Sequence, residues 1–330
     1  MRHYLWLPAY LLMLSFFLYV LVSTEGEESG VSAETSLAEE RMNLYMTYET
    51  PAAPWHLLAA IDRYERNIQR VRRDLEEVEG AIAFRFPEAF WSGAPNPEHG
   101  DSDPAAIEFF DGRGLDGNGD GKADPGDPED ILFTLAASLG KHGADEEAHR
   151  LALWEFYGSE EAVAQVMTIS DLFRHFGTIE LDDYAFPLPK SHNYTYKGTW
   201  GAKRGWGGRR MHEGTDLFAS YGVPVRSVTY GVIEVKGWNE FGGWRIGIRD
   251  ADNVYHYFAH LAYFEKGIEQ GQIVEPGTVV GYVGSSGYGK EGTAGKFPPH
   301  LHYGMYKFDG RSEWAFDPYP SLRRWEQQGK

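Results

Sequence analysis

The stretch VPVRSVTYGVIEVKGW, residues 223–238, decides the fold of the C-terminal half, because its apolar residues alternate with other residues in short runs. The pattern returns in GWRIGIRD (243–250), VYHYFAHL (254–261) and GTVVGYVG (277–284). Short alternating segments bounded by glycine turns are typical of β-strands in a sandwich or a curled sheet. We therefore predict that residues 186–330 form an all-β domain.

Upstream of this region the apolar residues follow a helical period. Side chains recur at spacings of three and four along the chain, at Leu58, Ile61, Tyr64, Ile68, Val71, Leu75 and Val78. Helical patterns return in PEDILFTLAASLGKHG (128–143) and EEAHRLALWEFYG (146–158). Since 330 residues suffice for two hydrophobic cores, we predict an α+β multidomain protein with a mostly α domain at 46–185.

The N-terminus begins with an apolar run from Tyr4 to about Val22 that is long enough to cross the hydrocarbon core of a membrane. Arg2 precedes the run and acidic residues follow it, which favours a cytoplasmic N-terminus. We predict a signal-anchor at 1–23, an acidic linker at 24–45 and extracytoplasmic C-terminal domains. A cleavable signal peptide is the alternative, although no A-x-A site ends the run.

Composition restricts the classes of partner and of metal site. The net charge is −18, from 31 basic and 49 acidic residues, which disfavours a nucleic-acid partner because phosphate backbones are bound by clusters of lysine and arginine. The chain has no cysteine, so it has neither disulfides nor thiolate ligands. Any metal must be held by imidazole and carboxylate groups.

Two histidine motifs lie far apart in the sequence. KFPPHLHYGM (296–305) contains His300 and His302, which share one face if the segment is a strand. RMHEGTDLFA (210–219) contains His212 and Asp216, which must be brought together by a turn, and a glycine lies between them. Either motif alone is also consistent with histidines that are merely hydrogen-bonded. Together they predict a metal site, where two imidazoles and one carboxylate leave a coordination position for water.

The order and spacing of several segments resemble the lysostaphin/LytM-type zinc endopeptidases of bacterial cell walls. These segments, between about residues 200 and 305, are RRMHEGTDLFASYGVPVRSVTYGVI, YHYFAHL, EKGIEQGQIVEPGTVVGYVGSSG and PPHLHYG. The resemblance implies an antiparallel β scaffold with a narrow groove that cuts amide bonds in peptidoglycan. It further implies that His212, Asp216 and His302 ligate zinc and that His260 and His300 form the catalytic pair.

The resemblance extends to the LytH-type L-Ala–D-Glu peptidases of endospore formers. It is carried by PWHLLAAIDRYERN, DGNGDGKADPGDPEDIL and the C-terminal EWAFDPYP. It implies cleavage of the stem peptide during cell-wall or spore-cortex remodelling. GYGKEGTAGKF (287–297) departs from the wider family, in which the chain runs more directly to the H-x-H motif, and this affects one wall of the groove.

A calcium-type loop is predicted at DGNGDGKADPGD (116–127). Oxygen-bearing side chains occupy loop positions 1, 3, 5, 9 and 12, at Asp116, Asn118, Asp120, Asp124 and Asp127. Position 12 is aspartate instead of glutamate, which weakens the expected bidentate contact. The alternative is an acidic, glycine-rich turn without an ion.

The same loop and the helix after it resemble a segment of lysozyme-like lytic transglycosylases. That resemblance implies a glycan-site carboxylate at Glu65, which ends the stretch LLAAIDRYE. Glu65 lies at the edge of an apolar helix face, a position that suits a cleft wall or a solvated edge. The leading interpretation is a membrane-anchored zinc peptidase with a lysozyme-like domain. The alternatives are a lytic transglycosylase with a non-catalytic β domain, and a non-catalytic scaffold, which the intact set of five residues disfavours.

Overall fold

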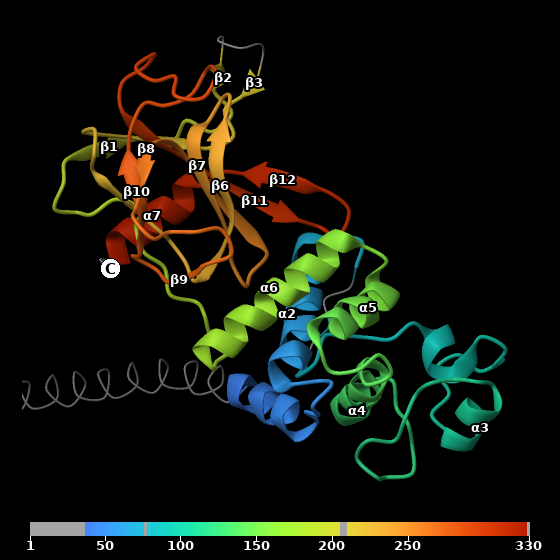
Figure 1. Cartoon of the computed structure of the whole chain (residues 1–330). Helices are drawn as coiled ribbons and strands as arrows, with labels where there is room; N and C mark the ends of the chain where they lie inside the picture. The colour runs from blue at the N-terminus through green and yellow to red at the C-terminus, as the bar shows by residue number, and fades with distance from the viewer. Residues whose placement is uncertain (1–36, 76–77, 79, 205–209, 329–330) are drawn as a thin grey trace, which may run out of the picture.

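The computed structural model describes residues 37–330 except 76–77, 79, 205–209 and 329–330 (Figure 1). Residues 37–47 are helical. The remaining helical elements are α2 (Trp55–Val71), η1 (Ala89–Gly93), α3 (Pro104–Phe109), α4 (Pro128–Leu139), α5 (Glu146–Tyr157), α6 (Glu160–Phe176) and α7 (Tyr319–Gln328). The strands are β1 (Tyr194–Tyr196), β2 (Lys203–Arg204), β3 (Arg210–Met211), β4 (Thr215–Ala219), β5 (Pro224–Arg226), β6 (Gly231–Asn239), β7 (Gly243–Arg249), β8 (Val254–Phe264), β9 (Ile273–Val274), β10 (Val279–Val283), β11 (His300–Phe308) and β12 (Glu313–Phe316).

Ten strands form one antiparallel sheet, as the alternating segments predict. Its main order is β1-β4-β11-β8-β7-β6-β9, with β10 paired to β5 and β8, and β12 paired to β11. Strands β2 and β3 pair with each other in a separate two-stranded sheet. Strands β4, β11 and β8 are therefore neighbours, although about 35 residues separate β4 from β8, and β8 from β11, in the sequence.

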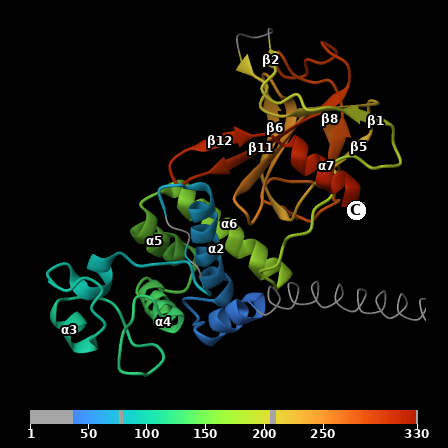
Figure 2. The ribbon, with the colours of Figure 1, turned by 180° about the vertical axis from the view of Figure 1, so that it is seen from behind.

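A C-terminal helix, which the sequence pattern did not predict, packs on one face of the β sheet. Figure 2 shows α7 lying against the strands. Its Trp325 ring lies 6.3 Å from the Tyr303 ring and stacks on Tyr184 at 5.2 Å. Only Leu322 and Trp325 of α7 are buried. Two apolar positions are too few to show a helical period in the sequence.

The N-terminal half is a bundle of helices around its own core. Helices α2 and α6 pack side by side, and α5 and α6 each end at a glycine in the left-handed conformation, Gly158 and Gly177. Helix α2 ends at Val71, although the apolar spacing continues to Val78. Leu75 is 40% exposed, so the continued spacing does not reflect burial.

The segment before α2 is helical over residues 37–47, which overlap the end of the predicted linker at 24–45. Tyr45 in the 37–47 helix is buried, and its hydroxyl donates to Asp62 Oδ2 at 2.8 Å. The predicted anchor at 1–23 lies outside the described residues. Among the residues that are described, no helix is both long and apolar enough to cross a membrane.

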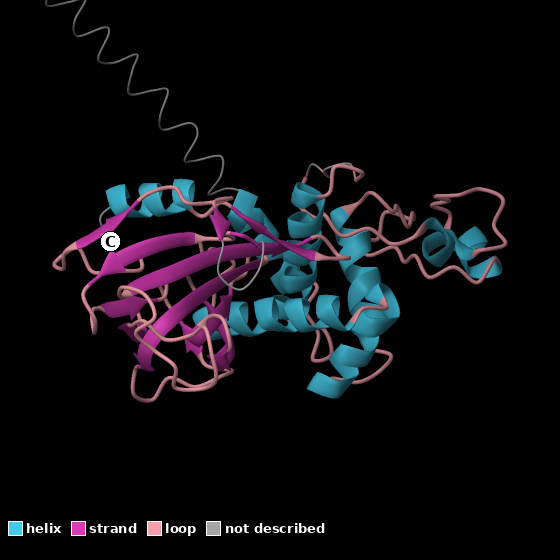
Figure 3. Cartoon of the chain, turned by 90° about the horizontal axis from the view of Figure 1, so that it is seen from above, coloured by secondary structure: helices cyan, strands magenta, loops and turns pink. Residues whose placement is uncertain are grey.

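The two halves are joined by the turn between β7 and β8. Arg63 on α2 pairs with Asp252 at 2.9 Å, and Asn67 Nδ2 donates to the carbonyl oxygen of Ala251 at 2.9 Å. Ala251 and Phe308 are buried in the helical core. The helices and the sheet therefore share a packed boundary (Figure 3).

Candidate active site

Three neighbouring strands bring the predicted histidines together. In the register of the sheet, His302 on β11 lies opposite Asp216 on β4 and opposite Ala259 on β8. Facing residues of an antiparallel pair have their side chains on the same face. His300, two residues from His302, therefore shares this face, as the period of two predicts.

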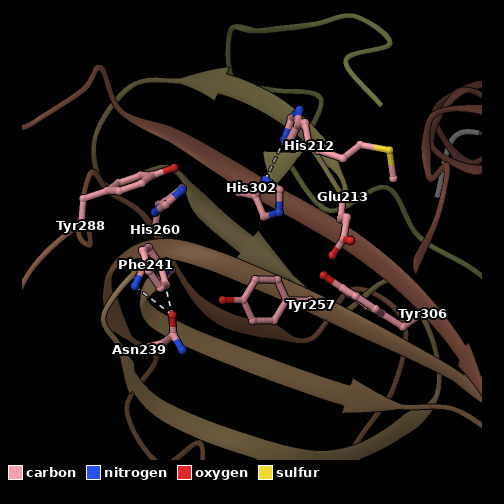
Figure 4. Close-up of a pocket in the computed structure, with 11 residues that line it drawn as sticks. His212, Glu213, Asn239, Phe241, Tyr257, His260, Tyr288, His302 and Tyr306 are labelled. Atoms are coloured by element: carbon pink, nitrogen blue, oxygen red, sulfur yellow. Dashed lines mark hydrogen bonds between the residues drawn. The ribbon is translucent and has the colours of Figure 1, made fainter. Parts of the chain in front are cut away.

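His212, Asp216 and His302 direct three donor atoms toward one point. His212 Nε2 lies 3.0 Å from His302 Nδ1 (Figure 4). Asp216 Oδ1 lies 3.1 Å from His212 Nε2 and 2.8 Å from His302 Nδ1. Donors about 2 Å from a tetrahedral ion are roughly 3.3 Å apart. Within the described residues, this is the one group of three or more histidine and acidic side chains close enough to share an ion. Its spacing and its nitrogen and oxygen donors suit zinc.

Hydrogen bonds behind the group orient its donors. The Nδ1–H of His212 donates to the Thr199 carbonyl at 3.0 Å, so the Nε2 lone pair faces the group. Burial alone would raise the pKa of Asp216, but the adjacent His212 and His302 side chains outweigh it and hold that pKa well below its usual range. Asp216 is therefore ionised at any working pH.

Gly214 is required by close packing against His302. A Cβ atom at this position would lie 2.5 Å from His302 Cε1 and 2.6 Å from the Tyr303 carbonyl oxygen. The chain does turn between His212 and Asp216, but the φ of Gly214 is not in the left-handed region. The glycine therefore allows the His302 ring to approach the backbone.

His260 reaches the same face through an irregularity in β8. The register of β8 with β7 shifts between Phe258 and Leu261, on either side of His260, and His260 has a φ of 63°. Left-handed non-glycine residues and β-bulges are concentrated at functional sites, where they redirect a side chain. The bulge brings the His260 ring to 4.8 Å from the His300 ring and 5.9 Å from the His302 ring.

His260 and His300 have the same tautomer. The Nδ1–H of His260 donates to the Ser286 carbonyl, and that of His300 to the Pro298 carbonyl, both at 2.8 Å. Because a carbonyl only accepts, Nδ1 carries a hydrogen in both rings, and the neutral form of each ring has its lone pair on Nε2. The Nε2 atom of His300 lies 3.8 Å from Asp216 Oδ1. Burial, His302 and His300 lower the pKa of His260 to about 3, so its ring is neutral. Two imidazoles beside a group of side chains that could hold a metal ion can accept and transfer protons.

Aromatic residues that the sequence interpretation missed line the cleft. One cavity of about 470 Å³ is lined by Met211, His212, Glu213, Asn239, Phe241, Gly242, Tyr257, His260, Tyr288, His302 and Tyr306. A second, of about 610 Å³, is lined by Asp216, Phe218, His260, Tyr288, Lys296, Phe297, Pro298 and His300. The period of two that pairs His300 with His302 also carries Tyr306 to this face, and this signal was available in the sequence.

His256 lies on the opposite face from His260, because the bulge breaks the alternation between them. It is fully buried, 2.8 Å from Asp250 Oδ2 and 2.7 Å from the Tyr303 hydroxyl. Its ring also lies 6.4 Å from that of Trp325. His256 is therefore a core residue beneath α7.

The predicted calcium loop is closed by its own hydrogen bonds. Both carboxylate oxygens of Asp116 accept from backbone amides, as do Asp120 Oδ1, Asp124 Oδ1 and the side-chain oxygen of Asn118. Asp127 caps the N-terminus of α4. These carboxylates do not form a group of three within ion-sharing distance among the described residues. The structure does not support calcium here, and calcium binding stays a prediction.

Glu65 lies in the helical half, apart from the five predicted residues of the sheet. It is partly buried on α2. Burial raises the pKa of Glu65 to about 7, Asp62 adds to this rise, and the neighbouring Tyr157 hydroxyl offsets part of it. Its carboxyl group is therefore partly protonated near neutral pH.

The raised pKa of Glu65 predicts a pH-dependent stability. The pKa of Glu65 is about 7 in the folded state and 4.5 in its ordinary state. Between these two pH values the folded state therefore keeps a proton that the unfolded state has released. The stabilisation is complete below pH 4.5 and is lost as the pH rises through 7. Glu65→Gln should be about 1–2 kcal/mol more stable than wild type at pH 8, after a discount for partial exposure, and equal to it near pH 4.5. Urea denaturation at both pH values measures this, with the exposed Glu40→Gln as the control. Equal curves at pH 8 would refute the raised pKa.

The sequence pattern of peptidase family M23 matches residues 210–318, the segment that carries all five residues. The L-Ala–D-Glu endopeptidase of Bacillus subtilis (strain 168) is 54% identical over 316 residues, which cover 96% of this chain and 97% of that protein. Lysostaphin of Staphylococcus simulans is 34% identical over 34% of this chain and 22% of its own length. The solved catalytic domain of lysostaphin is 29% identical, with a TM-score of 0.32, over 40% of this chain and 93% of that domain. Because the similarity to the Bacillus enzyme runs along nearly the whole sequence, this chain is an enzyme of peptidase family M23, an endopeptidase.

Proposed function

We propose that the chain is a zinc-dependent peptidoglycan endopeptidase that hydrolyses the amide between L-Ala and D-Glu of the stem peptide, during cell-wall or spore-cortex remodelling. The observation that carries the proposal is the convergence of His212, Asp216 and His302, with donor atoms within 3.1 Å of one another, beside His260 and His300. The choice of bond is supported by the name and the 54% identity of the Bacillus relative.

His212 Nε2, His302 Nδ1 and Asp216 Oδ1 would hold the zinc. When bound, zinc polarises a carbonyl group and makes water more acidic. The ionised Asp216 keeps one negative charge against the ion, and the Thr199 carbonyl keeps His212 in the tautomer that presents Nε2.

His260 and His300 would accept and donate the protons of the reaction. An Nε2 lone pair can take the proton of the attacking water, and the resulting imidazolium can pass it to the nitrogen of the leaving amine. The Nδ1–H bonds to the Ser286 and Pro298 carbonyls hold both rings in place and stabilise a positive charge on them. Donation from an imidazolium to the carbonyl oxygen would further stabilise the charge that develops there.

The rest of the chain would position this site next to its substrate, peptidoglycan. The helical domain, with its resemblance to lysozyme-like proteins, would seat the glycan strand. The apolar run at 1–23 would anchor the protein in the cell membrane, with the two domains extracytoplasmic.

A second candidate function is favoured by one observation. Glu65 has a pKa near 7, which suits a general acid acting on a glycosidic bond. In that case the protein would be a lytic transglycosylase and the β domain would only bind. Glycoside chemistry usually uses two carboxylates, however, and Glu65 has no assigned catalytic partner.

Mass spectrometry of digested peptidoglycan tests the proposal. Purified peptidoglycan treated with residues 24–330 should release muropeptides that end in L-Ala and peptides with a new amino group on D-Glu. Glu65→Gln should leave this release largely intact. Cleavage at another amide would refute the choice of bond. Anhydromuramyl ends, lost in Glu65→Gln, would establish the transglycosylase in its place.

A further inference from the structure

The segment 287–297, which departs from the wider family, forms a fixed wall of the cleft. The Gly287 amide donates to the Thr293 carbonyl, and the Gly289 amide donates to the Glu240 carbonyl, both at 2.9 Å. Ser286 and Ala294 also pair as an isolated β-bridge. The wall is therefore tied both to itself and to the turn between β6 and β7.

Lys296 lies at the end of this wall, next to the reaction centre. Its ammonium group donates to the Tyr288 carbonyl at 2.5 Å. The Tyr288 ring stacks on His260 at 6.0 Å. Phe297, the next residue, has its ring 4.6 Å from that of His260 and 5.1 Å from that of His300. Lys296 is itself exposed, and it lines the 610 Å³ cavity together with His260 and His300.

The charges of the cleft differ on its two sides. Apart from the metal ligand Asp216, the charged residue of the 610 Å³ cavity is Lys296. The 470 Å³ cavity, across His260, is lined by the exposed carboxylate Glu213, which Figure 4 shows near the Tyr306 hydroxyl. In the described parts of the chain, no other lysine or arginine lines either cavity. An anionic group beside the scissile bond is therefore favoured on the Lys296 side and disfavoured on the Glu213 side.

The proposed substrate carries such an anion. A D-Glu residue that continues the peptide through its γ-carboxyl has a free α-carboxylate, and this group is on the carbon bonded to the scissile nitrogen. We infer that Lys296 binds the α-carboxylate of D-Glu, which places the leaving-amine side of the substrate in the 610 Å³ cavity and the L-Ala side in the cavity of Glu213. This inference rests on the proposed function, and it makes Lys296 a residue that determines specificity.

A pair of substrates that differ in one group tests this role. The first is an N-acylated L-Ala–D-Glu peptide continued through the γ-carboxyl, and the second is the same peptide with its α-carboxylate amidated. Wild type should prefer the first in kcat/KM by about 10- to 100-fold, the range of a hydrogen bond to a charged group. Lys296→Met should lose this preference through its effect on the first peptide alone. Lys296→Arg should keep a preference, because it retains the charge.

The exposed Lys290 of the same wall provides the matched control, and Lys290→Met should keep the full preference. A preference that survives in Lys296→Met would overturn the inference, as would an equal loss on both peptides, which would indicate a structural role. If wild type cuts neither peptide yet cuts peptidoglycan elsewhere, the proposed bond is wrong and the inference falls with it. If wild type cuts both equally, the proposed function stands and the role of Lys296 is refuted.

Discussion

His302→Ala should lose bound zinc and peptidase activity together. The substitution removes Nδ1, which lies within 3.0 Å of the donor atoms of both His212 and Asp216. Two ligands remain where a catalytic zinc site in a protein usually has three. We expect less than about 0.1 zinc per chain by elemental analysis of the dialysed protein, and activity at background. The affinity for zinc falls steeply when one of three ligands is removed.

The exposed His192→Ala is the matched control and should keep both zinc and activity. Circular dichroism should show that His302→Ala retains the β fold, since the ligand lies on the open face of the sheet. Full zinc occupancy in His302→Ala would remove this residue from the ligand set.

His300→Ala and His260→Ala should keep zinc and lose activity. Each removes an Nε2 lone pair beside the donor group while leaving the three donor atoms in place. Loss of a proton-transferring imidazole should lower kcat by about 10²–10⁴-fold. The measurement is the rate of amino-group release from purified peptidoglycan, together with zinc content on the same samples.

These variants separate proton transfer from metal binding. Wild-type kcat in His300→Ala would show that this ring does not carry the proton. Loss of zinc in either variant would assign that residue to the ligand set instead. Since His260 has left-handed backbone geometry, His260→Gly is a useful second variant that releases backbone strain while removing the same ring.

Regular periodicity explains how much of the fold the sequence could predict. Strong patterns in 128–143 and 146–158 gave α4 and α5, and the alternating runs gave β6, β7, β8 and β10. Short or weakly apolar elements gave no comparable signal. Helix α7 has two buried anchors, and the 37–47 helix follows a polar, acidic stretch. The end of α2 was missed because exposed Leu75 continues the spacing by coincidence.

The candidate site could likewise be predicted from the sequence only where its geometry follows from a local pattern. The juxtaposition of His300 and His302 follows from the strand period alone, and the turn between His212 and Asp216 follows from distance. The position of His260 depends on a bulge in the pairing of β8 with β7, so no local pattern could have shown it. The reason for Gly214 is likewise non-local, since the ring that excludes a Cβ atom comes from β11.

Metal dependence of the wild-type enzyme tests the central claim most directly. The protein should be stripped with a chelator, and the release of amino groups from purified peptidoglycan should be followed before and after one equivalent of zinc is added back. We predict that stripping abolishes release and that zinc restores it, with identical products. Full activity in the stripped protein, with no zinc detected, would contradict the assignment of His212, Asp216 and His302 as the centre of catalysis.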